Sequence, residues 1–122
     1  MTKAVSRRVI IIEDNHDTAD SLATLLRMIG HGVEVAYSGE DGIQAAIRCR
    51  PDAVISDINL PGLDGWEVAR QLRARPSTAN TRLIAVTAYC DDDAEHRAKD
   101  SGFDHLLIKP ANPGSLLRLL VS

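Results

Sequence analysis

Long apolar runs are absent from this chain. Hydrophobic residues make up 44% of its 122 residues, yet no run approaches the ~20 residues that cross a bilayer. Residues 1–8 also lack the apolar core of a signal peptide. We therefore expect a cytoplasmic protein with no membrane insertion.

The chain also lacks an excess of basic charge and has few cysteines. Lys and Arg total 14 against 17 Asp and Glu, a net charge of −3. Surfaces that bind nucleic acid carry clustered Lys and Arg residues, so this acidic balance leads us to expect no direct nucleic-acid contact. Cys49 and Cys90 fit no metal-ligand spacing and no disulfide framework, which suits a reducing compartment.

Five short apolar runs alternate with stretches of helical periodicity, which is typical of β-α-β units. The runs are 9–12, 33–36, 53–56, 83–86 and 106–108. Right-handed crossovers place helices on both faces of such a sheet. The pattern predicts a flavodoxin-like, doubly wound α/β fold with five parallel strands in the order 2-1-3-4-5. The length fits a single domain over residues 1–122, with residues 1–7 as a flexible N-terminal extension.

Helical signals lie between these runs. Leu22, Leu25, Leu26 and Ile29 share one face of a first helix, which we expect to be buried, and Gly30 follows as a C-terminal cap. Later helices begin after cap signals at Ser38, at Asp64 and at Asn112 with Pro113.

The predicted fourth helix, residues 91–100, is an exception. It carries only Ala94 and Ala98 as small apolar anchors, so we expect it to be weakly held. In the third helix, by contrast, Trp66 is expected to be the packing anchor.

Polar residues suited to phosphoryl chemistry follow four of the five strands. These residues are Glu13 and Asp14, Asp57, Thr87, and Lys109 with Pro110. Parallel strands end at one edge of the sheet, where open α/β sheets bind ligands at the topological switch point. We therefore expect three acids, a hydroxyl and an ammonium in one small cleft.

Crowded carboxylates point to a metal ion. Glu13, Asp14 and Asp57 raise one another's pKa unless positive charge compensates them. Lys109 supplies one charge, and a residual of about −2 matches a divalent ion with oxygen ligands, a description that fits Mg²⁺. The Asn59 main-chain carbonyl is expected to complete the ligand shell.

With the ion bound, Asp57 can act as a nucleophile toward a phosphoryl group. Lys109 then neutralises charge on the phosphoryl oxygens, and Thr87 offers them a hydroxyl. The predicted product is an aspartyl phosphate, and the predicted signal is an inward movement of the loop after Thr87.

Four motifs in this order and spacing resemble the receiver domain of two-component response regulators, over essentially the whole chain. They are Glu13-Asp14, the segment Asp57–Gly65, Thr87-Ala88 and Lys109-Pro110. The resemblance implies a signalling phosphoacceptor rather than an enzyme. It implies Mg²⁺-dependent transfer from a phosphohistidine, on a histidine kinase or a phosphotransfer domain, to Asp57. It also implies a cis bond before Pro110.

Further implications concern output. The resemblance implies a homodimer or effector surface made of the fourth helix, the strand 106–108 and the last helix. The family usually has an aromatic switch residue where this chain has Leu106, which cannot act as one. Tyr89, two residues after Thr87, is our candidate gate to the phosphoryl group. The segment 102–105 is similar to receivers at the ends of hybrid histidine kinases.

Three alternatives remain. A haloacid-dehalogenase-type phosphatase also uses a strand-end Asp, but it wants a second acid at the position of Asn59; phosphomonoester turnover lost in Asp57→Asn would support it. A flavin-binding module of this fold needs a phosphate-cradling loop where Glu13 and Asp14 stand, and it would be coloured. A receiver that binds partners without phosphorylation is disfavoured because every chemical residue is present.

Overall fold

Strands and helices alternate along the chain, as the apolar runs predict. The computed structural model describes residues 6–88, 91–110 and 112–121. The elements are β1 (Arg8–Ile12), α1 (His16–Ile29), β2 (Gly32–Ala36), α2 (Gly39–Cys49), β3 (Ala53–Asp57), α3 (Gly65–Arg73), β4 (Arg82–Thr87), α4 (Ala94–Ser101), β5 (His105–Ile108) and α5 (Pro113–Val121).

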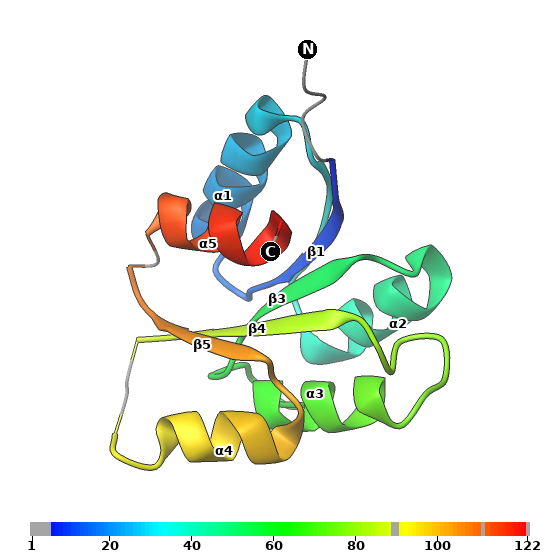
Figure 1. Cartoon of the computed structure of the whole chain (residues 1–122), viewed down its shortest axis with the longest axis vertical. Helices are drawn as coiled ribbons and strands as arrows, with labels where there is room; N and C mark the ends of the chain where they lie inside the picture. The colour runs from blue at the N-terminus through cyan, green and yellow to red at the C-terminus, as the bar shows by residue number, and fades with distance from the viewer. Residues whose placement is uncertain (1–5, 89–90, 111, 122) are drawn as a thin grey trace.

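The strands form one parallel sheet in the order β2-β1-β3-β4-β5, which confirms the predicted flavodoxin-like topology. Helices α1 and α5 cover one face, and α2, α3 and α4 cover the other (Figure 1). The register pairs Ile12 with Ser56 and Asp57 with Val86, so β1, β3 and β4 end close together. In the described part of the chain, no helix is long and apolar enough to span a bilayer.

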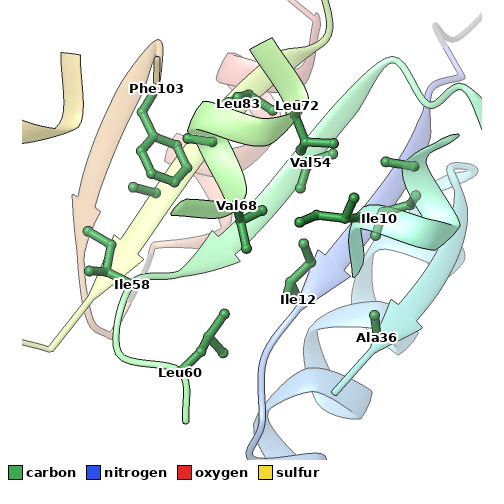
Figure 2. Close-up of a cluster of buried hydrophobic side chains, with 14 of the residues drawn as sticks. Ile10, Ile12, Ala36, Val54, Ile58, Leu60, Val68, Leu72, Leu83 and Phe103 are labelled. Carbon is green, nitrogen blue, oxygen red and sulfur yellow. The ribbon is translucent and has the colours of Figure 1, made fainter. Parts of the chain in front are cut away.

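A buried apolar cluster lies on each face of the sheet. Figure 2 shows the cluster on the α2–α4 face, where Val68 and Leu72 of α3 lie against the side chains of the central strands. On the α1–α5 face, Leu26 and Leu116 are both fully buried. Each strand of the core therefore presents apolar side chains to both faces, as expected for a parallel sheet covered on both sides.

Side-chain caps set the start of several helices. The side chains of Asn15, Ser38 and Asp64 each accept a hydrogen bond from the backbone N–H three residues later, at the start of α1, α2 and α3. For α5, Asn112 accepts from the N–H of Gly114 at 2.7 Å. The caps predicted at Ser38, Asp64 and Asn112 are confirmed.

The buried face of α1 differs from the expected one. Ala19, Ala23 and Leu26 are buried, whereas Ile29 is 43% exposed. Of the residues predicted for this face, Leu26 is fully buried and Leu22 packs against the same cluster, so the buried face includes part of the predicted one, and Ile29 lies outside it. The C-terminal cap is confirmed, because Gly30 adopts the left-handed conformation with φ 111°.

Residues 6 and 7 contact the rest of the fold, and Cys49 is the cysteine that the structure describes. The Ser6 hydroxyl donates to the Gly30 carbonyl, and the Arg7 backbone N–H donates to His31 Nδ1 at 3.0 Å, so these two residues of the expected N-terminal extension contact the fold. Cys49 is a half-buried free thiol. Tyr89 and Cys90 lie outside the described residues.

Candidate functional site

Three carboxylates meet at the carboxyl ends of β1 and β3. Glu13 follows β1, Asp14 comes next, and Asp57 is the last residue of β3. One oxygen from each lies within 4.8 Å of the others. Glu13 and Asp57 are buried, whereas Asp14 is exposed. The structure therefore brings the three predicted acids together, with an open side toward solvent.

Lys109 bridges two of these acids. Its ammonium donates to Glu13 Oε1 at 2.5 Å and to Asp57 Oδ2 at 2.8 Å. The lysine is held because its backbone N–H donates to the Thr87 carbonyl at 2.7 Å, which continues the pairing of β5 with β4. The peptide bond to Pro110 is cis, as the resemblance implies.

The charges in this cluster are unevenly balanced. Burial raises the pKa of the Glu13 carboxyl above its ordinary value, and the charge of Asp57 raises it further, against the hydrogen bond from Lys109. Burial alone would lower the pKa of Lys109, but the hydrogen bonds to Asp57 and Glu13 outweigh it, so that pKa is raised. Glu13 and Asp57 thus share one ammonium, Asp14 adds a third carboxylate beside them, and the excess negative charge favours a cation.

The donor set fits Mg²⁺. Carboxylate oxygens grouped at this spacing are the ligands that hard divalent cations take, and the exposed side leaves room for water ligands. Among the described residues, no other group of three or more acids, histidines or cysteines has its ligand atoms this close together.

The loop after β3 orients Asp57. The Asn59 backbone N–H donates to Asp57 Oδ1 at 3.0 Å, so each carboxylate oxygen of Asp57 has a partner. The Gly65 N–H donates to the Ile58 carbonyl at 2.9 Å and closes the loop. A Cβ at Gly65 would lie 2.4 Å from the Asp57 carbonyl oxygen. A side chain at residue 65 would therefore force the backbone to shift where α3 begins against the end of β3, a constraint that the sequence pattern does not reveal.

The residues predicted for switching lie along β4 and β5. Thr87 is buried at the end of β4 and pairs in register with Ile108, and Ala88 after it is exposed. Leu106 is half-buried and packs against the cluster on the α2–α4 face. Tyr89, the candidate gate, lies outside the described residues.

A cavity of about 470 Å³ opens beside the acids. Glu13, Asp57 and Lys109 form its polar end, and the remaining walls are mainly apolar side chains of α1 and the central strands. Glu13, Asp57 and Lys109 thus line a cleft, as the sequence predicts. Its apolar part along α1 was not predicted, because small residues such as Ala19 are ordinary core residues in a helical pattern.

An aromatic pair at the start of α1 was also missed. The His16 and Tyr37 rings stack with centroids 3.7 Å apart, and the Tyr37 hydroxyl donates to Asp20 Oδ1 at 2.7 Å. These contacts join α1 to the residue after β2. No sequence pattern predicts this stack, since the two rings are 21 residues apart in the chain.

The fold and this edge of the sheet define a class of doubly wound α/β domain with acids at the carboxyl ends of its strands, and comparisons with known proteins identify the family. A family model described as the response regulator receiver domain matches residues 9–121. The chain belongs to the family of response regulator receiver domains, which act in two-component signalling.

Curated relatives agree with this assignment. Over 84% of its own length, the chain is 37% identical to the transcriptional regulatory protein AfsQ1 of Streptomyces coelicolor. Over 90% of its own length, it is 33% identical to the transcriptional regulatory protein HprR of Escherichia coli. It spans 44% of AfsQ1 and 48% of HprR, about half of each. It spans 86% of a 14.6 kDa protein of Leptolyngbya boryana, with 32% identity.

Solved structures show the same fold. The chemotaxis protein CheY4 of Vibrio cholerae superposes with a TM-score of 0.89 at 26% identity, covering 96% of this chain and 98% of that one. The receiver domain of the sensor histidine kinase PA1611 of Pseudomonas aeruginosa superposes with a TM-score of 0.85 at 28% identity, covering 95% of both chains. That structure has a magnesium ion coordinated in its active-site cleft.

Proposed function

We propose that this domain accepts a phosphoryl group on Asp57 from the phosphohistidine of a histidine kinase or a phosphotransfer domain, in a Mg²⁺-dependent reaction. The observation that carries the proposal is the bridge that Lys109 forms between Glu13 and Asp57 beside the exposed Asp14. This arrangement combines a strand-end nucleophile, a fixed cation and an oxygen-rich cation site.

In the proposed step, a carboxylate oxygen of Asp57 attacks the phosphorus atom, and a P–O bond forms. The P–N bond to the donor imidazole breaks, and the imidazole nitrogen keeps the electron pair and takes up a proton. Lys109 lies within reach of the Asp57 carboxylate and stabilises the negative charge on the phosphoryl oxygens.

Glu13, Asp14 and Asp57 would hold Mg²⁺. The Asn59 main-chain carbonyl would complete the ligand shell. When bound, the ion supplies charge neutralisation for the phosphoryl oxygens. The Asn59 N–H keeps Asp57 oriented through its hydrogen bond to Oδ1, so the nucleophile is in place before the donor arrives.

The Thr87 hydroxyl would bind a phosphoryl oxygen once Asp57 is modified. Thr87 and Asp57 end adjacent strands, because Asp57 pairs with Val86 in register. Phosphorylation would thereby draw Thr87 and Ala88 toward the site, and the change would spread to the surface of α4, β5 and α5, where a homodimer or an effector would bind.

The test is phosphorylation of the purified domain with acetyl phosphate and Mg²⁺, read by intact mass. We expect the addition of one phosphate to the wild type and none to Asp57→Asn, which keeps the size of the side chain. Phosphate on Asp57→Asn would show that another residue is the acceptor.

A second experiment separates the metal site from the fold. Asp14→Ala should lose Mg²⁺ affinity in calorimetric titration and keep the far-UV circular dichroism of the wild type. Asp17→Ala is the matched control, because Asp17 is an exposed acid in the first turn of α1, three residues further on. Full Mg²⁺ affinity in Asp14→Ala would refute the ligand assignment.

A further inference from the structure

Helix α4 is held firmly at one end and loosely at the other. At its C-terminal end, the Gly102 N–H donates to the Ala98 carbonyl at 3.1 Å, and the Phe103 N–H donates to the same carbonyl at 2.9 Å. Phe103 is buried at 4% exposure. At its N-terminal end, Asp93 makes no side-chain cap hydrogen bond, and the Asp93 and Ala94 N–H groups donate to Asp91, in the turn just before the helix, at 3.0 and 3.2 Å.

Arg73, the last residue of α3, fixes the C-terminal end. Its guanidinium donates to the Gly102 carbonyl at 2.8 Å, to the Asp104 carboxylate at 2.9 Å, and to the Ala79 carbonyl at 2.8 Å. Asp104 also accepts from the Leu83 N–H at 2.9 Å, which ties the turn to β4. This end of α4 therefore belongs to the rigid part of the molecule.

Nearer the loose end, α4 lies against α3 through a cation–π contact. The Arg97 guanidinium carbon is 4.7 Å from the centroid of the Trp66 ring, inside the range in which such contacts stabilise. In the described part of the chain, no carboxylate pairs with Arg97. Trp66 in turn meets Phe103 edge to face, with centroids 6.3 Å apart and planes at 74°.

The other contacts of α4 are weak. Its buried side chains are Ala94, Ala98 and Ser101, which remove little apolar surface from water. The contact between Arg97 and Trp66 is therefore a large share of what holds the N-terminal half of the helix on α3. α4 is also the next element along the chain after Thr87.

We propose that α4 pivots about the turn held by Arg73, that the contact between Arg97 and Trp66 is the latch that keeps it closed, and that phosphorylation of Asp57 opens this latch. The inference rests on the proposed function. The latch needs no aromatic residue at position 106: Thr87 pairs with Ile108 of β5, and Leu106 of the same strand packs against the apolar cluster that Trp66 also contacts.

The experiment measures amide hydrogen exchange of residues 94–98 and the emission of Trp66, the one tryptophan of the chain, with and without acetyl phosphate and Mg²⁺. Phosphate incorporation is followed in the same samples by intact mass. We expect phosphorylation to speed exchange of these amides about two- to fivefold, the range of a cation–π contact, and to change the emission.

Arg97→Ala supplies the direct test of the latch. Without phosphorylation, its α4 amides should already exchange about two- to fivefold faster than wild type, and phosphorylation should add little. By linkage, the variant should bind beryllofluoride, which mimics the phosphoryl group, more tightly by the same factor. Lys99→Ala is the matched control, because it removes an exposed positive charge from the same helix and should behave as wild type.

Failure of the latch and failure of the proposed function give different results. A phosphorylated wild type with unchanged α4 exchange and Trp66 emission would overturn the latch and leave the proposed function intact. Wild-type exchange in unphosphorylated Arg97→Ala, or equal effects of Lys99→Ala and Arg97→Ala, would also overturn it. A chain that takes up no phosphate would overturn the proposed function and the latch together.

Discussion

At the scale of single residues, the candidate site shows how burial and charge act against each other. Glu13 is 5% exposed and is compensated by an ammonium that it shares with Asp57. Its raised pKa means that the ionised carboxylate is less stable in the folded protein than in water. The site thus stores unfavourable charge that a bound cation relieves.

Glu13→Gln should therefore stabilise the metal-free protein at neutral pH. A carboxyl whose pKa is raised by folding contributes full stability below its ordinary pKa, and this contribution is lost as the pH rises through the raised value. The variant should have a higher unfolding free energy than the wild type at neutral pH, and the difference should disappear as the pH falls below the ordinary pKa of glutamate. Urea unfolding in the presence of EDTA measures both values. A variant less stable than wild type at neutral pH would contradict the argument.

Gly65 offers a second prediction at this scale. Gly65→Ala places a Cβ 2.4 Å from the Asp57 carbonyl oxygen and 2.6 Å from the Ile58 Cα, so backbone must shift. We expect a loss of about 1 to 3 kcal/mol in unfolding free energy, with slower phosphorylation by acetyl phosphate because the nucleophile moves.

Gly32→Ala is the control for this substitution, because nothing lies within 4 Å of its added Cβ. It should change the unfolding free energy by no more than about 0.5 kcal/mol. Equal effects of the two substitutions would show that the close approach at Gly65 has no special cost.

At the scale of elements, helix caps differ in a way that can be measured. The Asp64 carboxylate accepts from the Glu67 N–H at 2.9 Å at the start of α3, whereas Asp93 makes no such bond at the start of α4. Asp64→Ala should cost about 1 kcal/mol of unfolding free energy, and Asp93→Ala should stay within about 0.5 kcal/mol. Thermal or urea unfolding checks both. A larger cost at Asp93 than at Asp64 would mean that α4 is better anchored than its contacts indicate.

Most elements could be predicted from the chain because local pattern and tertiary role agree. The apolar runs, the caps at Ser38 and Asp64, and the weak anchoring of α4 through Ala94 and Ala98 all appear in the structure. The buried face of α1 was predicted only in part, with Leu26 buried as expected and Ile29 exposed, because the centre of a helix's buried face depends on its packing against the sheet.

The candidate site was predictable for a similar reason. Strand ends in a parallel sheet meet at one edge, so Glu13, Asp57 and Lys109 had to lie close together once the strand order was known. The contact between Arg97 and Trp66, and the stack of His16 on Tyr37, depend on side-chain rotamers and helix packing. No local periodicity encodes such long-range pairs.

At the scale of the whole molecule, both faces of the sheet carry a core, and the same strands serve both. Ile10 and Ile12 point to one cluster, and Val9 and Ile11 point to the other. Loss of packing on one face therefore weakens strands that the other face needs. This shared sheet favours a single cooperative unfolding transition.

Leu26→Ala tests this cooperativity. Leu26 of α1 is fully buried on the α1–α5 face, while Trp66 reports on the opposite face. The substitution should cost about 2 to 5 kcal/mol. Trp66 emission and far-UV circular dichroism should still give the same urea midpoint, because the two faces share their strands. Met28→Ala is the matched control in the same helix, at a side chain 79% exposed, and should change little. Separate midpoints for the two probes in Leu26→Ala would show that the faces unfold independently, and that the sheet does not join them into one cooperative unit.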